Sequence, residues 1–388
     1  MTLKGYFDYN ATTPLSDAVK AEMRHAMEVF ANPSAAYPAA GPARALLAQA
    51  RQNVADLIDA APEQIFFTSC GTEGNNWALQ ASCAGAPGEA AIVTTAIEHD
   101  ATLAAARALG QSQGRPVHVA LPQSDGIVRA DAVARASAGP VAVYSVMLAN
   151  NETGAIQPVA EIAEIARDRA VPLHVDAVQA VGKMPVSVRA LGCDCLSLSG
   201  HKFHGPKGVG AMYVRDPGTF APMMIGGGQE RGLRPGTENL IGIAGLSAAA
   251  AEARALMDPN AARNRENRKR ILDGLRRQGV AFSINGPADD ARILPNTLNL
   301  SFDGLRAEAL AMRLAHLQGI AVSLGSACST NKDRRHSHVL VAMGLPEARL
   351  VSALRISFGR YTSQADIDAL VRALADGVAH LRQLSGAA

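Results

Sequence analysis

VAVYSVM at residues 141–147, VAEIAEIARDRA at 159–170 and PLHVD at 172–176 follow one another in the stretch that decides the fold. The first and third are almost continuous apolar runs rich in β-branched residues, which is typical of strands buried on both faces. The second repeats apolar residues at helical spacing, at Val159, Ile162, Ala163, Ile165 and Ala166. A helix between two buried strands predicts a parallel sheet that is covered by helices.

The same alternation extends over residues 60–215. Further strands are predicted at 65–68, 91–95, 116–120, 195–198 and 209–214, with another helix at 100–113. We therefore predict an α/β fold whose large domain has a mostly parallel sheet.

Beyond residue 255 the helices and strands occur in separate blocks. We expect a charged helix at 260–278, strands at 281–284 and 297–302, a helix at 306–318, another strand pair and a helix at 363–383. Such blocks are typical of an α+β domain. The sequence thus predicts a second, smaller domain of this class.

The composition is that of an ordinary globular protein. Of the 388 residues, 48% are apolar and 19% are charged, and the formal net charge is +2. Nothing in this balance indicates nucleic acid or an anionic membrane as a partner, and the basic run at 263–270 is interpreted as a solvated helix face. No apolar stretch approaches the length of a membrane span, and the N-terminus lacks a signal-peptide core.

Cysteine usage predicts a reducing compartment. The five cysteines, at positions 70, 83, 193, 195 and 328, are an odd number and do not form a disulfide framework, so we expect a cytoplasmic protein. Cys193 and Cys195 lack neighbouring His or Cys pairs, which favours buried strand positions over metal ligands. No metal site is predicted.

The run SGHKFHGPKGVG at 199–210 places Lys202 among glycines and histidines, just after a predicted strand. Loops beyond the carboxyl ends of strands are where α/β enzymes carry functional groups. A lysine that forms a Schiff base must lose its proton, which desolvation or nearby positive charge favours. These residues alone favour that role no more than a surface lysine in a glycine-rich turn.

Two further motifs suit a charged ligand. Asp176 ends an apolar strand, and a carboxylate there is costly to bury unless a cation such as a protonated pyridine nitrogen meets it. A cap of the following helix is the better interpretation of Asp176 alone. TSCGTEG at 68–74 predicts a helix N-terminus that suits a phosphate or a plain cap, and it is neither a Walker loop nor a GxGxxG motif.

Together these motifs resemble the class V, fold-type I enzymes that use pyridoxal 5′-phosphate (PLP), and within them the NifS/IscS-like cysteine desulfurases. The resemblance covers nearly the whole chain, and the order and spacing of its motifs make it specific. The motifs are DYNATTP at 8–14, NPS at 32–34, FTSCGTE at 67–73, EH at 98–99, NNETG at 150–154, VDAVQAVGK at 175–183, SGHK at 199–202, GGGQERGLRPGTEN at 226–239, SACS at 326–329 and LRISFGR at 354–360.

The resemblance implies a role for each site residue. Lys202 would carry the cofactor, Asp176 would keep its pyridine nitrogen protonated, and His99 would stack on the ring and shuttle protons. The oxygen side of the ring would be bound by Asn151 and Gln179. The phosphate would be bound by Gly71, Thr72, Ser199 and His201, with Thr237 from the other subunit of a homodimer. Arg355 and Asn151 would bind the substrate, and Arg355 would grip its carboxylate. On its own, Arg355 would be interpreted as a surface ion-pair partner.

The resemblance also implies a large PLP-binding domain over 15–255 and a small domain, formed by 1–14 and 256–388, that carries the catalytic cysteine. Cys328 would take sulfur from L-cysteine as a persulfide and leave L-alanine. A sulfur-acceptor protein such as an iron–sulfur scaffold would receive the sulfur, and Cys328 would transiently contact an iron–sulfur cluster. Without the resemblance, Cys328 is as readily an incidental exposed thiol.

Three features depart from the family pattern. Tyr37 stands near a position where the family often has His, the segment after Cys328 is longer and more basic, and the C-terminus is shorter than in IscS-type members. The last two concern the sulfur acceptor rather than the chemistry. The alternatives are a selenocysteine lyase, another class V aminotransferase, or a non-catalytic sulfur-carrier scaffold, against which the intact Lys202, Asp176, His99 and Cys328 argue.

Overall fold

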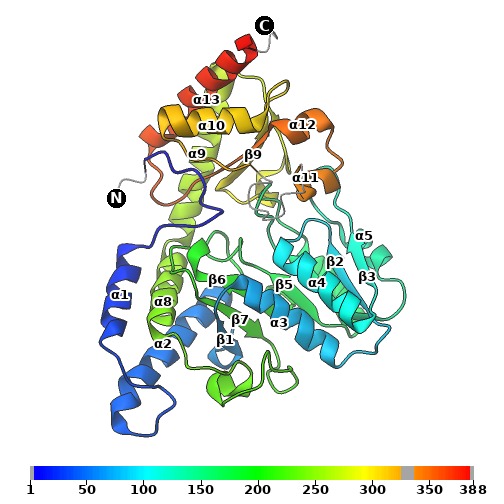
Figure 1. The fold of residues 1–388 in the computed structure, drawn as a ribbon, viewed down its shortest axis with the longest axis vertical. Coiled ribbons are helices and arrows are strands. Elements are labelled where there is room, and N and C mark those ends of the chain that lie inside the picture. The colour runs from blue at the N-terminus through cyan, green and yellow to red at the C-terminus, as the bar shows by residue number, and fades with distance from the viewer. Residues whose placement is uncertain (1–3, 325–335, 385–388) are drawn as a thin grey trace.

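A seven-stranded sheet forms the centre of the larger part of the molecule (Figure 1). The computed structural model describes residues 4–324 and 336–384. The strand order is β1-β7-β6-β5-β4-β2-β3, and only β7 runs antiparallel to its neighbours. The strands are β1 (Ile65–Thr68), β2 (Ala91–Thr95), β3 (Val117–Ala120), β4 (Val141–Met147), β5 (Leu173–Asp176), β6 (Cys195–Ser199) and β7 (Gly210–Val214). The predicted α/β class is confirmed.

Helices cover both faces of this sheet because its strands bury apolar side chains on each side. On β1, Phe67 belongs to the core of one face, whereas Phe66 packs with Trp77 on the other. The first core takes in α2 (Gly41–Ile58), α6 (Val159–Asp168) and α8 (Leu240–Ala255), and the second face is covered by α3 (Gly71–Ala84) and α4 (Asp100–Gln113). This double burial makes the strands appear in the sequence as apolar runs.

A smaller antiparallel sheet of order β10-β9-β8 lies beyond the large one and has its own core (Figure 1). Its strands are β8 (Ser283–Ile284), β9 (Thr297–Ser301) and β10 (Ala353–Ser357), and its helices are α9 (Met257–Arg277), α10 (Ala307–Gln318) and α13 (Gln364–Leu384). Phe7 from the N-terminal segment joins this core. These contacts support our proposal that 1–14 and 256–388 form a small domain beside 15–255.

The prediction of a further strand pair between α10 and α13 is wrong for the part of this region that the structure describes. Only β10 is a strand there, and Ala321 and Ser323 form isolated bridges with Tyr6 and Arg355. Two short helices, α11 (His338–Ala342) and α12 (Glu347–Ser352), precede β10. They are too short to show helical periodicity in the sequence. The longer helices α1 (Asp17–Met27) and α2 were also not predicted.

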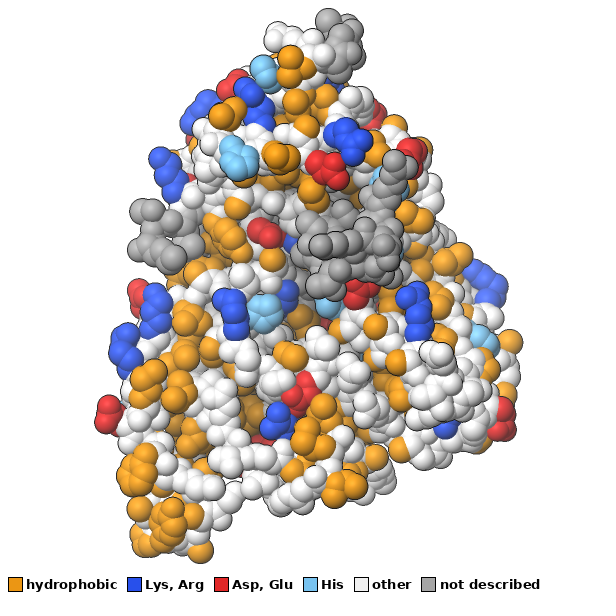
Figure 2. Space-filling view, in the orientation of Figure 1, with side chains coloured by type: hydrophobic (Ala, Val, Ile, Leu, Met, Phe, Trp, Pro, Cys, Tyr) orange, Lys and Arg blue, Asp and Glu red, His pale blue; other side chains and the backbone are white. Residues whose placement is uncertain are grey.

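The surface mixes side chains of different kinds. On the face shown in Figure 2, Lys and Arg side chains alternate with Asp and Glu, and apolar side chains gather over the end of α1 and the start of α2. Within residues 4–324 and 336–384, no single helix is long and apolar enough to cross a membrane. The helices α8 and α9 are long and apolar enough only when they are counted as one helix, and the chain bends by 71° between them. Cys193 and Cys195 are both fully buried, as predicted.

Candidate active site

A cavity of about 310 Å³ lies at the carboxyl ends of the parallel strands, between the large sheet and β10. It is the place that the fold favours for a ligand, since parallel strands present their loops together at this edge. The predicted site residues in its wall are Gly71, Thr72, His99, Asn151, Asp176, Gln179, Ser199, His201, Lys202 and Arg355. Segments far apart in the sequence thus contribute to one cavity.

Lys202 follows β6 in a short turn, Gly200–Lys202, and its amine faces the N-terminal segment. Lys202 Nζ donates to the carbonyl oxygens of Asn10 at 2.8 Å and Ala11 at 2.9 Å. The surroundings are positively charged: burial, Lys202 and Arg355 lower the pKa of Lys183 well below its usual range. An amine held in this way at the cavity wall can attack a carbonyl carbon once it has lost its proton.

Asp176 is the last residue of β5, and its buried carboxylate is held by two donors. Oδ2 accepts from Asn75 Nδ2 at 2.6 Å and Oδ1 accepts from the Val178 backbone N–H at 3.0 Å. No helix begins at residue 177, so the interpretation of Asp176 as a helix cap is wrong. A carboxylate fixed in this way at a cavity wall can hold a protonated ring nitrogen.

The opposite part of the cavity is suited to an anion. Helix α3 begins at Gly71, so its free backbone N–H groups point toward the cavity that Gly71 and Thr72 line. Ser199 Oγ is buried there and has no hydrogen-bond partner among the described residues. A Cβ on Gly71 would collide with Cγ2 of Val178, so a larger residue at this position would require the Val178 side chain to move. A phosphate group fits this arrangement of donors.

Two histidines of the cavity wall, His99 and His201, differ in how exposed they are. His201 lies beside the anion corner, where burial, Lys202 and Lys207 lower its pKa to about 4. His99 is exposed and caps α4, because its Nδ1 accepts from the Ala101 backbone N–H at 3.1 Å. When His99 is neutral, this cap leaves the ring proton on Nε2. The imidazole can then exchange a proton through Nε2 at the cavity wall.

Arg355 lies in the middle of β10 and is only 1% exposed, so its interpretation as a surface ion-pair partner is wrong. Its Nη2 is 2.8 Å from Asp8 Oδ1, and its Nη1 donates to the Asn151 carbonyl oxygen at 3.1 Å. The guanidinium lines the cavity opposite the large sheet. A buried arginine in this position can bind a carboxylate through two parallel hydrogen bonds.

The sequence analysis missed one residue that connects these groups. The backbone oxygen of Asn10 accepts from Lys202 and from Gln179 Nε2, and the Asn10 side chain donates to the Asn151 carbonyl oxygen at 3.1 Å. Its Oδ1 accepts from Lys183 Nζ at 3.0 Å. Asn10 lies in the DYNATTP motif at 8–14, which was recognised for its resemblance but not assigned a role. Asn75, which holds Asp176, was missed as well.

Two predicted site residues remain, one outside the cavity wall and one outside the described residues. Thr237 is exposed in the loop 226–239 and is not in the cavity of its own chain. Its assignment to the partner's phosphate stays a prediction. Cys328 falls within 325–335, outside the described residues, and its role also stays a prediction.

Known proteins of similar sequence and structure identify the family. The model of the family described as Aminotransferase class-V matches residues 5–370. A cysteine desulfurase from Nostoc sp. is 40% identical over 381 residues, which is 98% of this chain and 94% of the relative. A solved NifS-like protein has a TM-score of 0.88 at 36% identity and covers 97% of this chain and 100% of its own. A protein named SspA, solved in complex with cysteine, has a TM-score of 0.79 at 34% identity and covers 91% and 98%. The chain belongs to the class V aminotransferase family, among its NifS/IscS-like cysteine desulfurases.

Proposed function

We propose that this protein is a PLP-dependent cysteine desulfurase that converts L-cysteine to L-alanine and passes the sulfur to Cys328. The observation that carries the proposal is the convergence of Lys202, Asp176 and the buried Arg355 on one cavity. An amine, a fixed carboxylate and a carboxylate-binding guanidinium are the groups that a PLP enzyme needs for an amino-acid substrate.

The residues in the cavity fit PLP along its whole length. Gly71, Thr72, Ser199 and His201 would bind the phosphate, Asp176 would hold the pyridine nitrogen, and Asn151 and Gln179 would bind the oxygen side of the ring. When bound through Lys202, PLP supplies an electron sink for the bonds around the substrate α-carbon.

The proton transfers are assigned to two side chains. Lys202 would be the base for the α-proton, because its amine belongs to the cavity wall that holds the substrate. His99 exchanges a proton through Nε2, because Nδ1 is occupied by the hydrogen bond from the Ala101 backbone N–H.

Arg355 orients the substrate. Its guanidinium would bind the cysteine carboxylate, and the ion pair with Asp8 restrains the position of the guanidinium.

Sulfur transfer requires a second nucleophile. The Cys328 thiolate attacks the substrate sulfur, so that an S–S bond forms while the Cβ–S bond breaks and its electron pair stays on carbon. Protonation of that carbon gives alanine, and the enzyme keeps a persulfide. L-cysteine and one thiol thus become alanine and one persulfide without any external oxidant. A sulfur-acceptor protein such as an iron–sulfur scaffold would receive the sulfur.

We also propose that the protein acts as a homodimer in which Thr237 reaches the partner's phosphate site. Of the large apolar side chains that are exposed, Phe30 is 90% exposed and Ile225 is fully exposed. Ile225 directly precedes the loop 226–239 that carries Thr237, and exposed apolar surface of this kind favours association. The cytoplasmic location stays a prediction from cysteine usage.

Incubation of the purified protein with PLP and L-cysteine tests the proposal. We expect a visible cofactor absorption band, L-alanine as product, and a mass increase of one sulfur atom on the peptide that contains Cys328. Amino transfer to an added keto acid, without alanine or persulfide, would instead identify an aminotransferase.

A further inference from the structure

The described residues on either side of the segment that carries Cys328 are bonded to Arg355 of the cavity wall and to two residues next to it in sequence, Glu98 and Glu152. We propose that Ser337 and His338 are positioning residues for sulfur transfer, because they hold one end of this segment beside His99 and Asn151. The proposal rests on the proposed desulfurase function. It concerns only the step in which Cys328 takes the sulfur.

The N-terminal end of the segment is fixed by the substrate-binding strand itself. Ser323 and Arg355 exchange two backbone hydrogen bonds, of 3.0 Å from Ser323 N and 2.8 Å from Arg355 N. Any movement of this end would therefore disturb the backbone of Arg355.

The C-terminal end is fixed by two side chains that cross to the large domain. Ser337 Oγ is 2.5 Å from Glu152 Oε2, and both residues are buried. His338 Nε2 is 2.8 Å from the carbonyl oxygen of Glu98. Because a carbonyl oxygen can only accept, Nε2 carries the hydrogen and donates the hydrogen bond. We call these two bonds the anchor contacts. Glu152 directly follows Asn151 and Glu98 directly precedes His99, so each anchor contact ends next to a residue of the cavity wall.

Chain length explains why the C-terminal end needs anchoring. Cys328 follows Ser323 by five residues and precedes Ser337 by nine. An extended chain spans at most about 3.5 Å per residue, which allows about 17 Å on the first side and about 32 Å on the second. By length alone, the connection to Ser337 allows a larger distance between the thiol and its fixed end than the connection to Ser323 does. Fixing the end of the longer connection at Ser337 and His338 restricts where the thiol can be and raises its effective concentration near the cavity.

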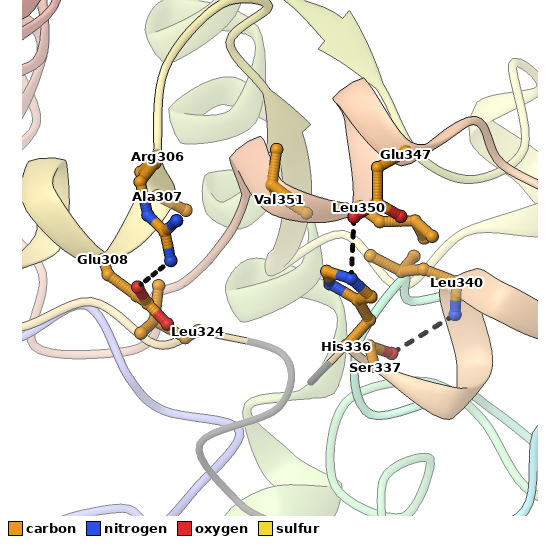
Figure 3. A pocket seen from close by; sticks show the side chains of 11 residues that line it. Arg306, Ala307, Glu308, Leu324, His336, Ser337, Leu340, Glu347, Leu350 and Val351 are labelled. Carbon is orange, nitrogen blue, oxygen red and sulfur yellow. Dashed lines mark hydrogen bonds and ion pairs between the residues drawn. The ribbon is translucent and has the colours of Figure 1, made fainter. Parts of the chain in front are cut away.

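A second histidine provides a matched control. His336, two residues before His338, pairs with Glu347 at 3.0 Å, and Glu347 is largely exposed at the start of α12. In Figure 3 the His336 ring points toward Glu347, whereas Ser337 lies at the turn into α11 and also receives the Leu340 backbone N–H. Both His336 and Glu347 belong to the small domain, so their pair does not join the segment to the large domain.

The test compares His338→Leu and Ser337→Ala with wild type, with His336→Leu as the control. Rapid mixing with L-cysteine measures two quantities: the change of the cofactor absorption band, and the persulfide and alanine formed in a single turnover. We expect the absorption change to stay within about twofold in both variants, while persulfide formation slows about tenfold or more, since misplacement of a reacting group by about 1 Å can slow a step by about a hundredfold. His336→Leu is expected to match wild type in both measurements.

Conservative replacements separate positioning from folding. His338→Gln keeps an N–H donor and Ser337→Thr keeps the hydroxyl, so both are expected to recover most of the persulfide rate. They also carry the test if the Leu or Ala variant fails to fold. Wild-type persulfide rates in folded His338→Leu and Ser337→Ala would overturn the proposal, as would an equal slowing of the absorption change. A wild-type protein that forms no alanine would instead refute the desulfurase function, which is a different outcome.

Discussion

The two walls of the cavity are built in different ways. The large-domain wall consists of the ends of β5 and β6 and the start of α3, so Asp176, Ser199 and Gly71 are placed by a continuous buried sheet. The small-domain wall consists of Arg355 on β10, which is held by Asp8 from the opposite end of the chain. Asn10 bridges the walls, since it contacts Lys202 on one side and Thr297 of β9 on the other.

This difference indicates that the two walls serve different parts of the reaction. Groups that are fixed by the sheet suit the cofactor, which must stay in one orientation through many turnovers. Groups on the small domain suit the substrate and the sulfur, which enter and leave. Substitutions in the first wall should therefore abolish all chemistry, and those in the second should affect substrate binding or sulfur transfer alone.

Lys202→Ala should have the largest effect, because it removes both the cofactor attachment and the proposed base. We expect alanine formation to fall by roughly a thousandfold or more. Alanine release at saturating cysteine and PLP measures this loss. Lys207→Ala removes an exposed lysine of the same SGHKFHGPK run and should retain activity within about twofold. Reduction with borohydride should label Lys202, and a label on Lys183 would contradict the assignment.

Cys328→Ser should stop the reaction at a later step. A serine hydroxyl at neutral pH is a much poorer nucleophile toward sulfur than a thiolate, so we expect alanine to fall by about a hundredfold. PLP binding and the absorption change with L-cysteine should persist, because the large-domain wall is intact. Mass spectrometry after a brief cysteine pulse should find no persulfide. A persulfide on Cys70 or Cys193 in wild type would show that the catalytic thiol is another residue.

Arg355→Lys should affect substrate binding rather than cofactor binding. One ammonium cannot reproduce the two parallel bonds of a guanidinium, and loss of about 2 kcal/mol would raise KM for cysteine roughly thirtyfold. Steady-state kinetics measure this change, with Arg263→Lys on the surface of α9 as the control. An unchanged KM with full activity would place the carboxylate site elsewhere.

Most of the large-domain wall could be predicted from the sequence. Strands that are buried on both faces appear as apolar runs, and the polar residues that interrupt them at their ends, such as Asp176 and Lys202, stand out. The strands predicted between residues 65 and 214 agree with the structure to within one residue. Local pattern and final position coincide here because each strand carries its functional residue at its own end.

The small-domain wall could not be predicted by the same reasoning. Arg355 interrupts a five-residue strand and shows no local sign of burial, since its partner Asp8 is at the other end of the chain. Asn10 likewise acts through its backbone oxygen, and no sequence pattern reports on a backbone group. Only the resemblance to a family identified Arg355, and nothing identified Asn10, Ser337 or His338. The local sequence patterns therefore did not predict contacts between segments that are far apart in the chain.

Glu98 should make the stability of the folded protein depend on pH. It is completely buried; its Oε1 accepts from Thr95 Oγ1 and from the Met147 backbone N–H, and its carbonyl oxygen receives the anchor contact of His338. Burial is the main cause that raises its pKa from 4.5 to about 8, with a further contribution from the charge of Asp176. At pH 7 the folded protein therefore retains a proton that the unfolded chain has released.

Stability should consequently fall with rising pH through this one group. Between pH 4.5 and 8 the folded state binds one proton more than the unfolded state, so its contribution to the free energy of unfolding decreases by at most about 1.4 kcal/mol per pH unit and levels off above pH 8. Glu98→Gln keeps an acceptor for Thr95 and Met147 but cannot titrate. Urea unfolding at pH 6 and pH 7 should therefore show wild type losing about 1 kcal/mol more than Glu98→Gln over this interval. Glu164→Gln, on the exposed face of α6, should keep the wild-type pH dependence. Parallel pH profiles for wild type and Glu98→Gln would mean that Glu98 is already ionised in the folded protein and that its buried charge is balanced by groups other than Thr95 and Met147.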